Sequence, residues 1–146
     1  MPVRIVTDNC CDLPQEILER YGIPRVHMLV RFGSEEYLPE NLDLKWFYEQ
    51  MRVRPEPPTT SQPLVEEMAR VYGDALSDGS EVIVIQLSSQ LSGTYQSALM
   101  VGESLPGKER LHIVDSHRAS ISEGLCVLEA ARMAEEGCSA AEITAR

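Results

Sequence analysis

The sequence predicts an α/β protein: a mainly parallel sheet flanked by helices on both faces. Three observations indicate this class. Strand-like and helix-like segments alternate along the chain, an order that sets parallel strands side by side with helices between them. Residues 81–87, EVIVIQL, are almost continuously apolar, as expected of a strand covered on both faces. The 146 residues, 43% of them hydrophobic, suffice for one domain with a real core.

A strand and a helix open the chain. Residues 3–7, VRIVT, are rich in β-branched side chains and predict the first strand. We expect the first helix to begin near Asp12, a good N-cap, with Pro14 in its first turn and Gly22 at its end. Its inward side chains recur with helical spacing: Pro14, Ile17, Leu18 and Tyr21.

The next segment predicts a strand, a turn and a helix. Residues 25–32 form the predicted second strand, and Gly33 indicates a turn into a short return strand near Tyr37. Asp43 is expected to cap a helix that runs through 46–51.

A proline-rich stretch, PEPPTTSQP, occupies residues 55–63. Its prolines exclude a helix until the stretch ends, because proline lacks an N–H group and restricts the residue before it. We expect a rigid loop that delivers Thr59, Thr60 and Ser61 to the start of a helix. That helix has one apolar face: Leu64, Met68, Val71, Tyr72 and Ala75.

The second half of the chain repeats the strand–loop–helix order. The strand at 81–87 leads into a Ser/Gly-rich loop at 88–94, and a fourth strand at 111–114 ends at Asp115. The helix between these strands is expected to turn one side inward: Tyr95, Ala98, Leu99 and Gly102.

Two capping boxes follow. Ser120 with Glu123 opens a predicted helix whose inward side chains are Val127, Leu128, Ala131 and Ala134. Ser139 with Glu142 announces another helix just before the chain ends. We interpret residues 1–146 as one domain that is truncated or completed by a partner. A frayed terminal turn is the simpler alternative.

Charge and composition exclude several classes of function. Thirteen basic and 23 acidic residues give a net charge of −10, which argues against nucleic acid and anionic membranes as partners. No apolar run exceeds four residues and no basic-then-apolar leader opens the chain, so neither membrane insertion nor export is predicted. The cysteines lack zinc or CxxC spacing and indicate free thiols in a reducing, cytoplasmic setting: Cys10, Cys11, Cys126 and Cys138.

Four loops are expected to share one site. Ligands of parallel sheets bind beyond the carboxyl ends of the strands, where loops 8–12, 57–63, 88–94 and 115–120 would meet. Hydroxyl-lined helix starts attract anions through unpaired N–H groups. Neither hydroxyl-rich loop contains Lys or Arg, and no phosphate-binding glycine motif occurs, which favours a single carboxylate held by neutral donors. Plain N-caps are the alternative.

Enzymatic alternatives use residues at the same edge. Ser92, His117 and Asp115 could serve a small hydrolase or a phosphoryl-transfer enzyme, although no GxSxG elbow is present. Asp8 and Asp115 could together hold Mg²⁺, but such carboxylates more often cap loops. A third alternative is a degenerate domain that serves only as an interaction module.

Several segments together resemble the DegV family of bacterial fatty-acid-binding proteins. TSQP at 60–63, followed about thirty residues later by SSQLSGTYQSA at 88–98, is the most specific pair of motifs. The other matching segments, in chain order, are 5–8 (IVTD), 12–14 (DLP), 32–33 (FG), 36–37 (EY), 43–44 (DL), 47–48 (FY) and 115–116 (DS).

The resemblance implies a two-domain α/β protein that holds one long-chain fatty acid in an apolar tunnel. Members of the family lack catalytic activity and present the acyl carboxylate to a separate fatty acid kinase. By resemblance, Thr60 of TSQP and Ser92 with the Gly93 backbone N–H of LSGT would bind the carboxylate. No metal ion or cofactor is implied.

Two departures from the family pattern stand out. Asn9, Cys10 and Cys11 replace the usual Ser-Thr-Ala, so no role is transferred to them. The second domain of the family is absent from this sequence. It would supply a histidine to the carboxylate network, one side of the tunnel and part of the kinase-docking surface. The apolar surface left open would favour self-association.

Overall fold

The strands of the computed structural model, which describes residues 1–146, form two sheets. The main sheet is parallel, with strand order β2-β1-β6-β7. Its strands are β1 (Val3–Asp8), β2 (Arg25–Val26), β6 (Glu81–Gln86) and β7 (Leu111–Asp115). A small antiparallel sheet, in the order β4-β3-β5, consists of β3 (Leu29–Phe32), β4 (Glu35–Tyr37) and β5 (Thr59–Ser61). The predicted α/β class is confirmed.

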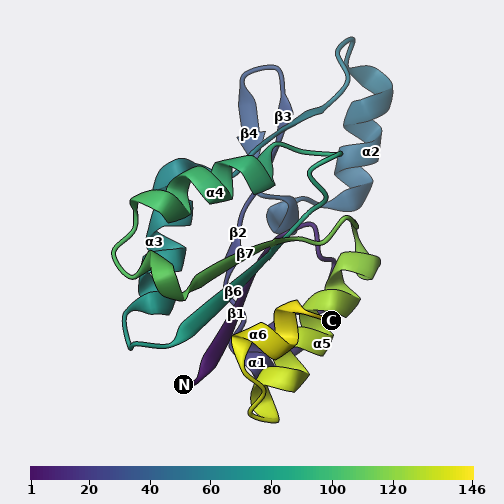
Figure 1. Ribbon diagram of the computed structural model, residues 1–146. Coiled ribbons are helices and arrows are strands. Elements are labelled where there is room, and N and C mark those ends of the chain that lie inside the picture. Colours follow the sequence, from purple (N-terminus) through teal and green to yellow (C-terminus); the bar gives the residue numbers. More distant parts are fainter.

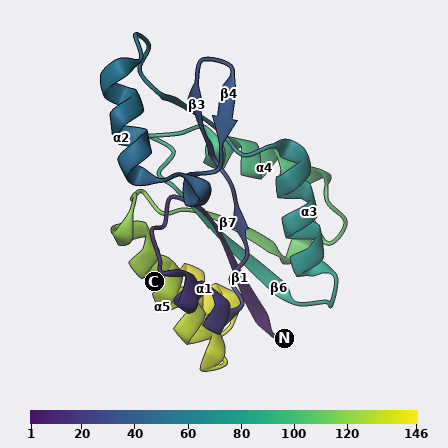
Figure 2. The same cartoon turned by 180° about the vertical axis from the view of Figure 1, so that it is seen from behind.

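Helices cover both faces of the main sheet (Figure 1). One face carries α1 (Gln15–Tyr21), α5 (Ile121–Glu135) and α6 (Ala140–Thr144), and the other carries α3 (Val65–Leu76) and α4 (Thr94–Ser104). The small sheet and α2 (Leu44–Val53) lie at the end of the main sheet that is distant from the N-terminus (Figure 2). Short 3-10 turns occur at Pro39–Asn41 and Lys108–Arg110. None of the helices combines the length and apolarity that a membrane span requires.

Strand β6 explains why its sequence is apolar without a break. Because successive side chains of a strand point to opposite faces, Ile83 and Ile85 enter the core beneath α1, α5 and α6. Val82 and Val84 enter the second core, beneath α3 and α4. All four side chains are buried, and β6 is paired on both edges, with β1 and β7. The prediction of a strand covered on both faces is confirmed.

Helix ends that depend on near neighbours follow the sequence prediction. The Asp43 side chain accepts a hydrogen bond from the Trp46 N–H at 2.7 Å and so caps α2. Gly22 ends α1 in the left-handed conformation, with φ of 61°. Ser139 and Glu142 form the predicted capping box of α6, which buries Ala140 and Ile143.

The prediction of one continuous strand at 25–32 was wrong. The chain leaves the main sheet after Val26 and enters the small sheet at Leu29. Between them, the Asn9 side chain accepts from the Met28 N–H at 2.9 Å and donates to the Met28 carbonyl at 3.1 Å. The Glu67 carboxylate accepts from the His27 N–H at 3.2 Å. These side chains satisfy the backbone where no neighbouring strand does, so the chain can change sheets.

The prediction that Thr59, Thr60 and Ser61 begin a helix was also wrong. These residues form β5, which pairs with the open edge of β3 through the partners Arg31, Val30 and Leu29. The helix α3 begins only at Val65, with Leu64 in the N-cap position. Of the predicted apolar face, Leu64 is 59% exposed. The other four side chains are buried, together with Leu76: Met68, Val71, Tyr72 and Ala75. In α4, Val101 is buried where Leu99 was expected, and Leu99 is 40% exposed.

Two predicted caps do not form. Pro14, not Asp12, holds the N-cap position of α1, and Ser120 makes no side-chain cap on α5. The two side chains bind each other instead: the Ser120 hydroxyl donates to the Asp12 carboxylate at 2.5 Å, across 108 residues of sequence. Glu123, expected to complete the capping box, is fully buried. A tertiary contact therefore replaces two local ones.

At Gly124, α5 packs closely against the loop after β1. A Cβ at Gly124 would collide with the backbone carbonyl oxygen of Cys11, whereas a Cβ at Gly73 in α3 would meet no atom within 4 Å. Gly124→Ala should therefore destabilise the fold by ~1–3 kcal/mol. Gly73→Ala, the matched control, should stabilise it by ~0.5–1 kcal/mol.

Thermal unfolding followed by circular dichroism checks this prediction. The melting temperatures of the two variants should move in opposite directions from that of the wild type. Equal melting temperatures for the Gly124→Ala variant and the wild type would contradict the close packing of α5 on the loop.

Candidate functional site

The loops at the carboxyl end of the main sheet are joined by backbone-to-carboxylate hydrogen bonds. The Asp8 carboxylate, at the end of β1, accepts from the Leu87 N–H at 2.8 Å. The Asp115 carboxylate, at the end of β7, accepts from the Ser89 N–H at 3.2 Å. The loop at 88–94 is thus held from both neighbouring strands, and the predicted gathering of loops at this edge is confirmed for three of the four segments.

The fourth segment, TSQP, reaches the same place through Gln62. The Ser97 hydroxyl in α4 donates to the Gln62 side-chain oxygen at 2.6 Å. A Cβ at residue 93 would collide with Gln62 Nε2, so the Gln62 side-chain amide packs directly against Gly93. Thr60 lies two residues before Gln62, in the middle of β5. The two motifs, about thirty residues apart in sequence, are therefore in contact.

The first turn of α4 offers free donors. Gly93 occupies the N-cap position, and no side chain caps the helix there. The Ser92 hydroxyl lies 2.9 Å from that of Thr94 and accepts from the Thr94 N–H at 3.3 Å. The N–H groups of Gly93, Tyr95 and Gln96 have no hydrogen-bond partner. Unpaired N–H groups and the helix dipole favour an anion at this position.

A buried pair of carboxyl groups lies next to this loop. Asp8 and Glu123 are both fully buried. Burial, together with the neighbouring Asp8 charge, raises the pKa of Glu123 from its ordinary value of 4.5 to about 9. Burial also raises the pKa of Asp8, although hydrogen bonds from two backbone N–H groups favour its anion and partly offset that rise. At neutral pH Glu123 is therefore the protonated member of the pair.

Sequence reasoning missed the position of Glu123, although a signal was available. Glu123 precedes Val127 by four residues and Ala131 by eight, so helical spacing places it on the inward side of α5. The prediction instead followed the Ser120–Glu123 spacing, which is typical of a capping box and places Glu123 at the helix start. The role of Asn9 in ordering Met28 had no local signal, because the contact spans 19 residues.

The cysteines of the first loop are unsuited to nucleophilic chemistry. Burial and the Asp8 charge raise the pKa of the Cys10 thiol to about 12, and burial raises that of Cys11. All four cysteines are free, and both thiols of this loop are protonated at neutral pH.

The enzymatic arrangement of Ser92, His117 and Asp115 is not assembled. His117 Nδ1 lies 3.3 Å from Asp115 Oδ2, but the His117 side chain is 72% exposed. The hydrogen-bond partner of the Ser92 hydroxyl is Thr94, not His117. The oxygens of Asp8 and Asp115 that were considered for Mg²⁺ accept backbone N–H groups. No cluster of three or more potential metal-ligating side chains is present.

Two sizeable cavities lie elsewhere on the main sheet. One, of about 600 Å³, opens between β6, β7, α5 and α6, with Ser116 and Arg118 at the carboxyl end of the sheet. Its apolar lining includes Ile83, Ile85, Val114, Leu125, Met133 and Ile143. This apolar groove adjoins the loop at 115–120, one of the loops of the candidate site.

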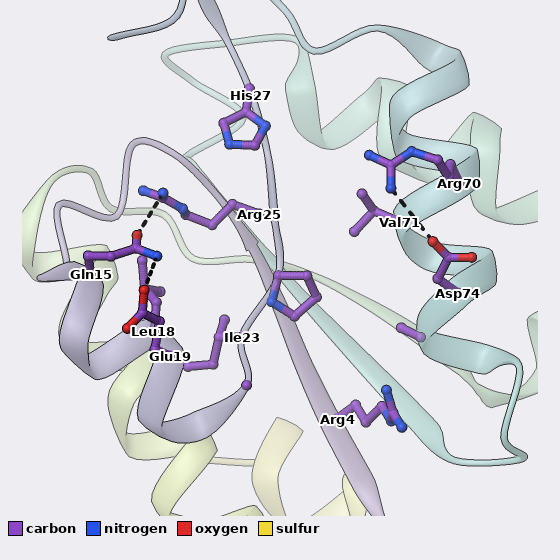
Figure 3. Close-up of a pocket in the computed structure, with 13 residues that line it drawn as sticks. Arg4, Gln15, Leu18, Glu19, Ile23, Arg25, His27, Arg70, Val71 and Asp74 are labelled. Carbon is purple, nitrogen blue, oxygen red and sulfur yellow. Dashed lines mark hydrogen bonds and ion pairs between the residues drawn. The ribbon is translucent and has the colours of Figure 1, made fainter. Parts of the chain in front are cut away.

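The other cavity, of about 550 Å³, lies along β2 between α1 and α3 (Figure 3). Three arginines line it, and two of them interact with neighbours: Arg25 donates to Gln15 at 3.2 Å, and Arg70 lies 3.6 Å from Asp74. Arg4, the third, pairs with Asp78 outside the lining. Thr60, Ser92 and Gly93, the residues predicted to bind a carboxylate, line neither of the two cavities.

Comparison with protein families gives one clear match. A family model described as "Uncharacterised protein, DegV family" matches residues 2–146. The chain is 37% identical over 137 residues to a DegV domain-containing protein of Clostridium perfringens, and 34% identical over 143 residues to protein DegV of Bacillus subtilis. These alignments cover 92% and 97% of this chain but 48% and 50% of the relatives. The chain thus spans about half the length of the curated relatives it matches.

Solved structures agree in fold and sequence. A DegV family protein from Thermus thermophilus, whose structure is reported for fatty acid binding, is 36% identical with a TM-score of 0.92. DegV from Bacillus subtilis, reported as a fatty acid binding protein, is 32% identical with a TM-score of 0.87. Each match covers 99% of this chain and 51% of the solved chain.

The protonated state of Glu123 predicts a pH-dependent stability. A folded-state pKa raised from 4.5 to about 9 means that the unfolded chain releases this proton first, so stability falls as pH rises through that interval. Glu123→Gln keeps a neutral side chain and removes this loss. The melting temperature of the variant should exceed that of the wild type by a margin that grows from pH 5 to pH 9, with a limit of about 1.4 kcal/mol per pH unit.

Thermal melts at several pH values measure the margin. Glu135→Gln, on the exposed side of the same helix, is the control and should show a constant margin. A constant margin for Glu123→Gln as well would mean that Glu123 is ionised in the folded protein.

Proposed function

The chain belongs to the DegV family, and on that premise we propose that it binds a long-chain fatty acid and catalyses no reaction on it. Fatty acid binding is reported for relatives from Thermus thermophilus and Bacillus subtilis that are 36% and 32% identical to it. We propose that residues 1–146 form a single N-terminal domain of the family type. The chain spans about half of these relatives, so the complete acyl site of a longer protein would include surfaces beyond this domain.

The proposed head-group site consists of neutral donors. The Thr60 hydroxyl, the Ser92 hydroxyl and the Gly93 N–H would donate to the acyl carboxylate. The observation that carries this proposal is the packing of Gln62 against Gly93, which brings the TSQP and LSGT motifs into contact. Thr60 itself lies in β5, so only Ser92 and Gly93 belong to a helix start.

The chemistry of these donors suits a single carboxylate better than a polyphosphate. Neither 59–62 nor 88–94 contains a Lys or Arg side chain. A polyphosphate carries several charges and usually recruits a cation, whereas a carboxylate is satisfied by a few hydrogen bonds. The free N–H groups at the start of α4 add a partial positive charge without a counterion.

Presentation to a second protein is compatible with the exposure of this site. The Thr60 side chain is exposed and Ser92 is half-buried, so a carboxylate bound between them would be accessible from solvent. We propose that a fatty acid kinase is the protein that receives the head group. The apolar groove beside the loop at 115–120 is lined by eight hydrophobic residues, against four in the arginine-lined cavity in Figure 3.

Removal of either hydroxyl should weaken fatty acid binding. Loss of one hydrogen bond to a charged group costs ~1.5–3 kcal/mol, so Thr60→Ala and Ser92→Ala should each raise the dissociation constant roughly tenfold to a hundredfold. Thr59→Ala, next to Thr60 in β5 but on the other face, should leave binding unchanged.

Mass spectrometry of lipid extracts from the purified variants, together with titration of the delipidated proteins, measures the effect. Wild-type affinity in both hydroxyl variants would contradict the head-group site. Turnover of an ester or phosphate substrate that disappears in Ser92→Ala would favour the enzymatic alternative.

A further inference from the structure

The two buried carboxyl groups occupy the point where the Ser92 loop leaves the sheet. Asp8 is the last residue of β1, and Glu123 lies in the first turn of α5. Both side chains have no exposed surface. A pair of acids is rarely buried in this way without a structural or functional reason, because each charge loses its hydration.

The Asp8 carboxylate orders the backbone of two loops. Its Oδ2 accepts from the Leu87 N–H and its Oδ1 accepts from the Cys10 N–H, each at 2.8 Å. Leu87 is the residue immediately before the loop at 88–94. Hydrogen bonds of this kind are strong when the acceptor is ionised. An anionic Asp8 therefore fixes the starting direction of the loop that carries Ser92.

Glu123 must be neutral to remain beside that anion. The Thr7 hydroxyl reaches Glu123 Oε1 at 3.4 Å, and Glu123 Oε2 has no hydrogen-bond partner. An ionised Glu123 would place a second, poorly solvated negative charge next to the first. The close approach of Gly124 to Cys11, and the Ser120–Asp12 hydrogen bond, hold α5 against the loop after β1.

Acidic groups dominate the charge around the pair, and the nearby cation, Arg25 of β2, acts on the Cys11 thiol. The charged groups that act on Glu123 are Asp8 of β1 and Asp12 of the following loop, and both are acidic. The same loop brings the Cys10 and Cys11 thiols close to the pair. On the other side of Asp8, α3 contributes the buried Tyr72 hydroxyl.

We propose that the buried acid pair, Asp8 and Glu123, positions the Ser92–Gly93 loop and makes its affinity for a carboxylate ligand depend on pH. With one proton on the pair, Asp8 holds the Leu87 N–H and the loop keeps its binding geometry. When Glu123 releases that proton to solvent, the two carboxylates repel and the hold on Leu87 weakens. This inference rests on the proposed function, because it takes the Ser92 loop as the head-group site.

The affinity for a fatty acid at alkaline pH tests the proposal. Since the pKa of Glu123 is about 9, about one tenth of the protein retains the single-proton pair at pH 10. Affinity of the wild type for a long-chain fatty acid should then fall about tenfold between pH 7 and pH 10, in proportion to the competent fraction. Glu123→Gln cannot ionise and should lose this dependence. Glu135→Gln should retain it.

A second measurement follows the loop without any ligand. Hydrogen-exchange protection of residues 87–92, normalised to that of α3 in the same sample, should fall with rising pH in the wild type and stay level in Glu123→Gln. Asp8→Asn should lower this protection at every pH, because an amide cannot accept at both positions. If Asp8→Asn does not fold, the Glu123→Gln comparison still decides the question.

The two measurements separate the two proposals. Loop protection that depends on Glu123, without fatty acid binding at any pH, would support the positioning role and overturn the head-group site. Identical pH profiles of affinity and protection in the wild type and Glu123→Gln would overturn the positioning role. Circular dichroism at each pH confirms that the comparison is made on folded protein.

Discussion

Two hydrogen bonds to one buried carboxylate determine the geometry of the carboxyl edge of the sheet. Asp8 accepts from Leu87 and from Cys10, and so ties the end of β1 both to the loop after β6 and to the turn that leads to α1. The neutral state of Glu123 follows from this constraint, because an anion already occupies the adjacent position. The close approach of α5 and its glycine at 124 complete the enclosure of the pair. The candidate site is built on this edge.

The two sheets are held in place by different kinds of contact. The parallel sheet has a core on each face, and β6 contributes alternate side chains to both. The small sheet is attached through side chains, with Asn9 and Glu67 taking the place of strand partners around Met28. This attachment carries β5 to the start of α4, where Gln62 meets Gly93. A site assembled from both sheets thus depends on a few polar contacts between them.

The similarity to fatty acid binding proteins and the local chemistry support the same proposal independently. Membership of the DegV family gives the class of ligand reported for relatives. The absence of basic side chains from the two hydroxyl-bearing segments, and the free N–H groups of α4, give a separate reason to expect a monoanion there.

Sequence alone determined the elements whose stabilising partners are near in the chain or repeat with a fixed period. The apolar alternation of β6, the Asp43 cap and the Ser139 capping box were predicted, because each depends on neighbours within four residues or on a two-residue period. The α/β class followed from the order of such elements, and the motifs proposed to bind a carboxylate were located by resemblance.

Only the tertiary structure decided the break at 27–28, the strand β5, the Ser120–Asp12 contact and the inward Glu123. Each of these depends on a partner between 19 and 116 residues away. Asp12 and Ser120 could each cap a helix locally, yet they bind each other, and no local sequence pattern records such a distant partner.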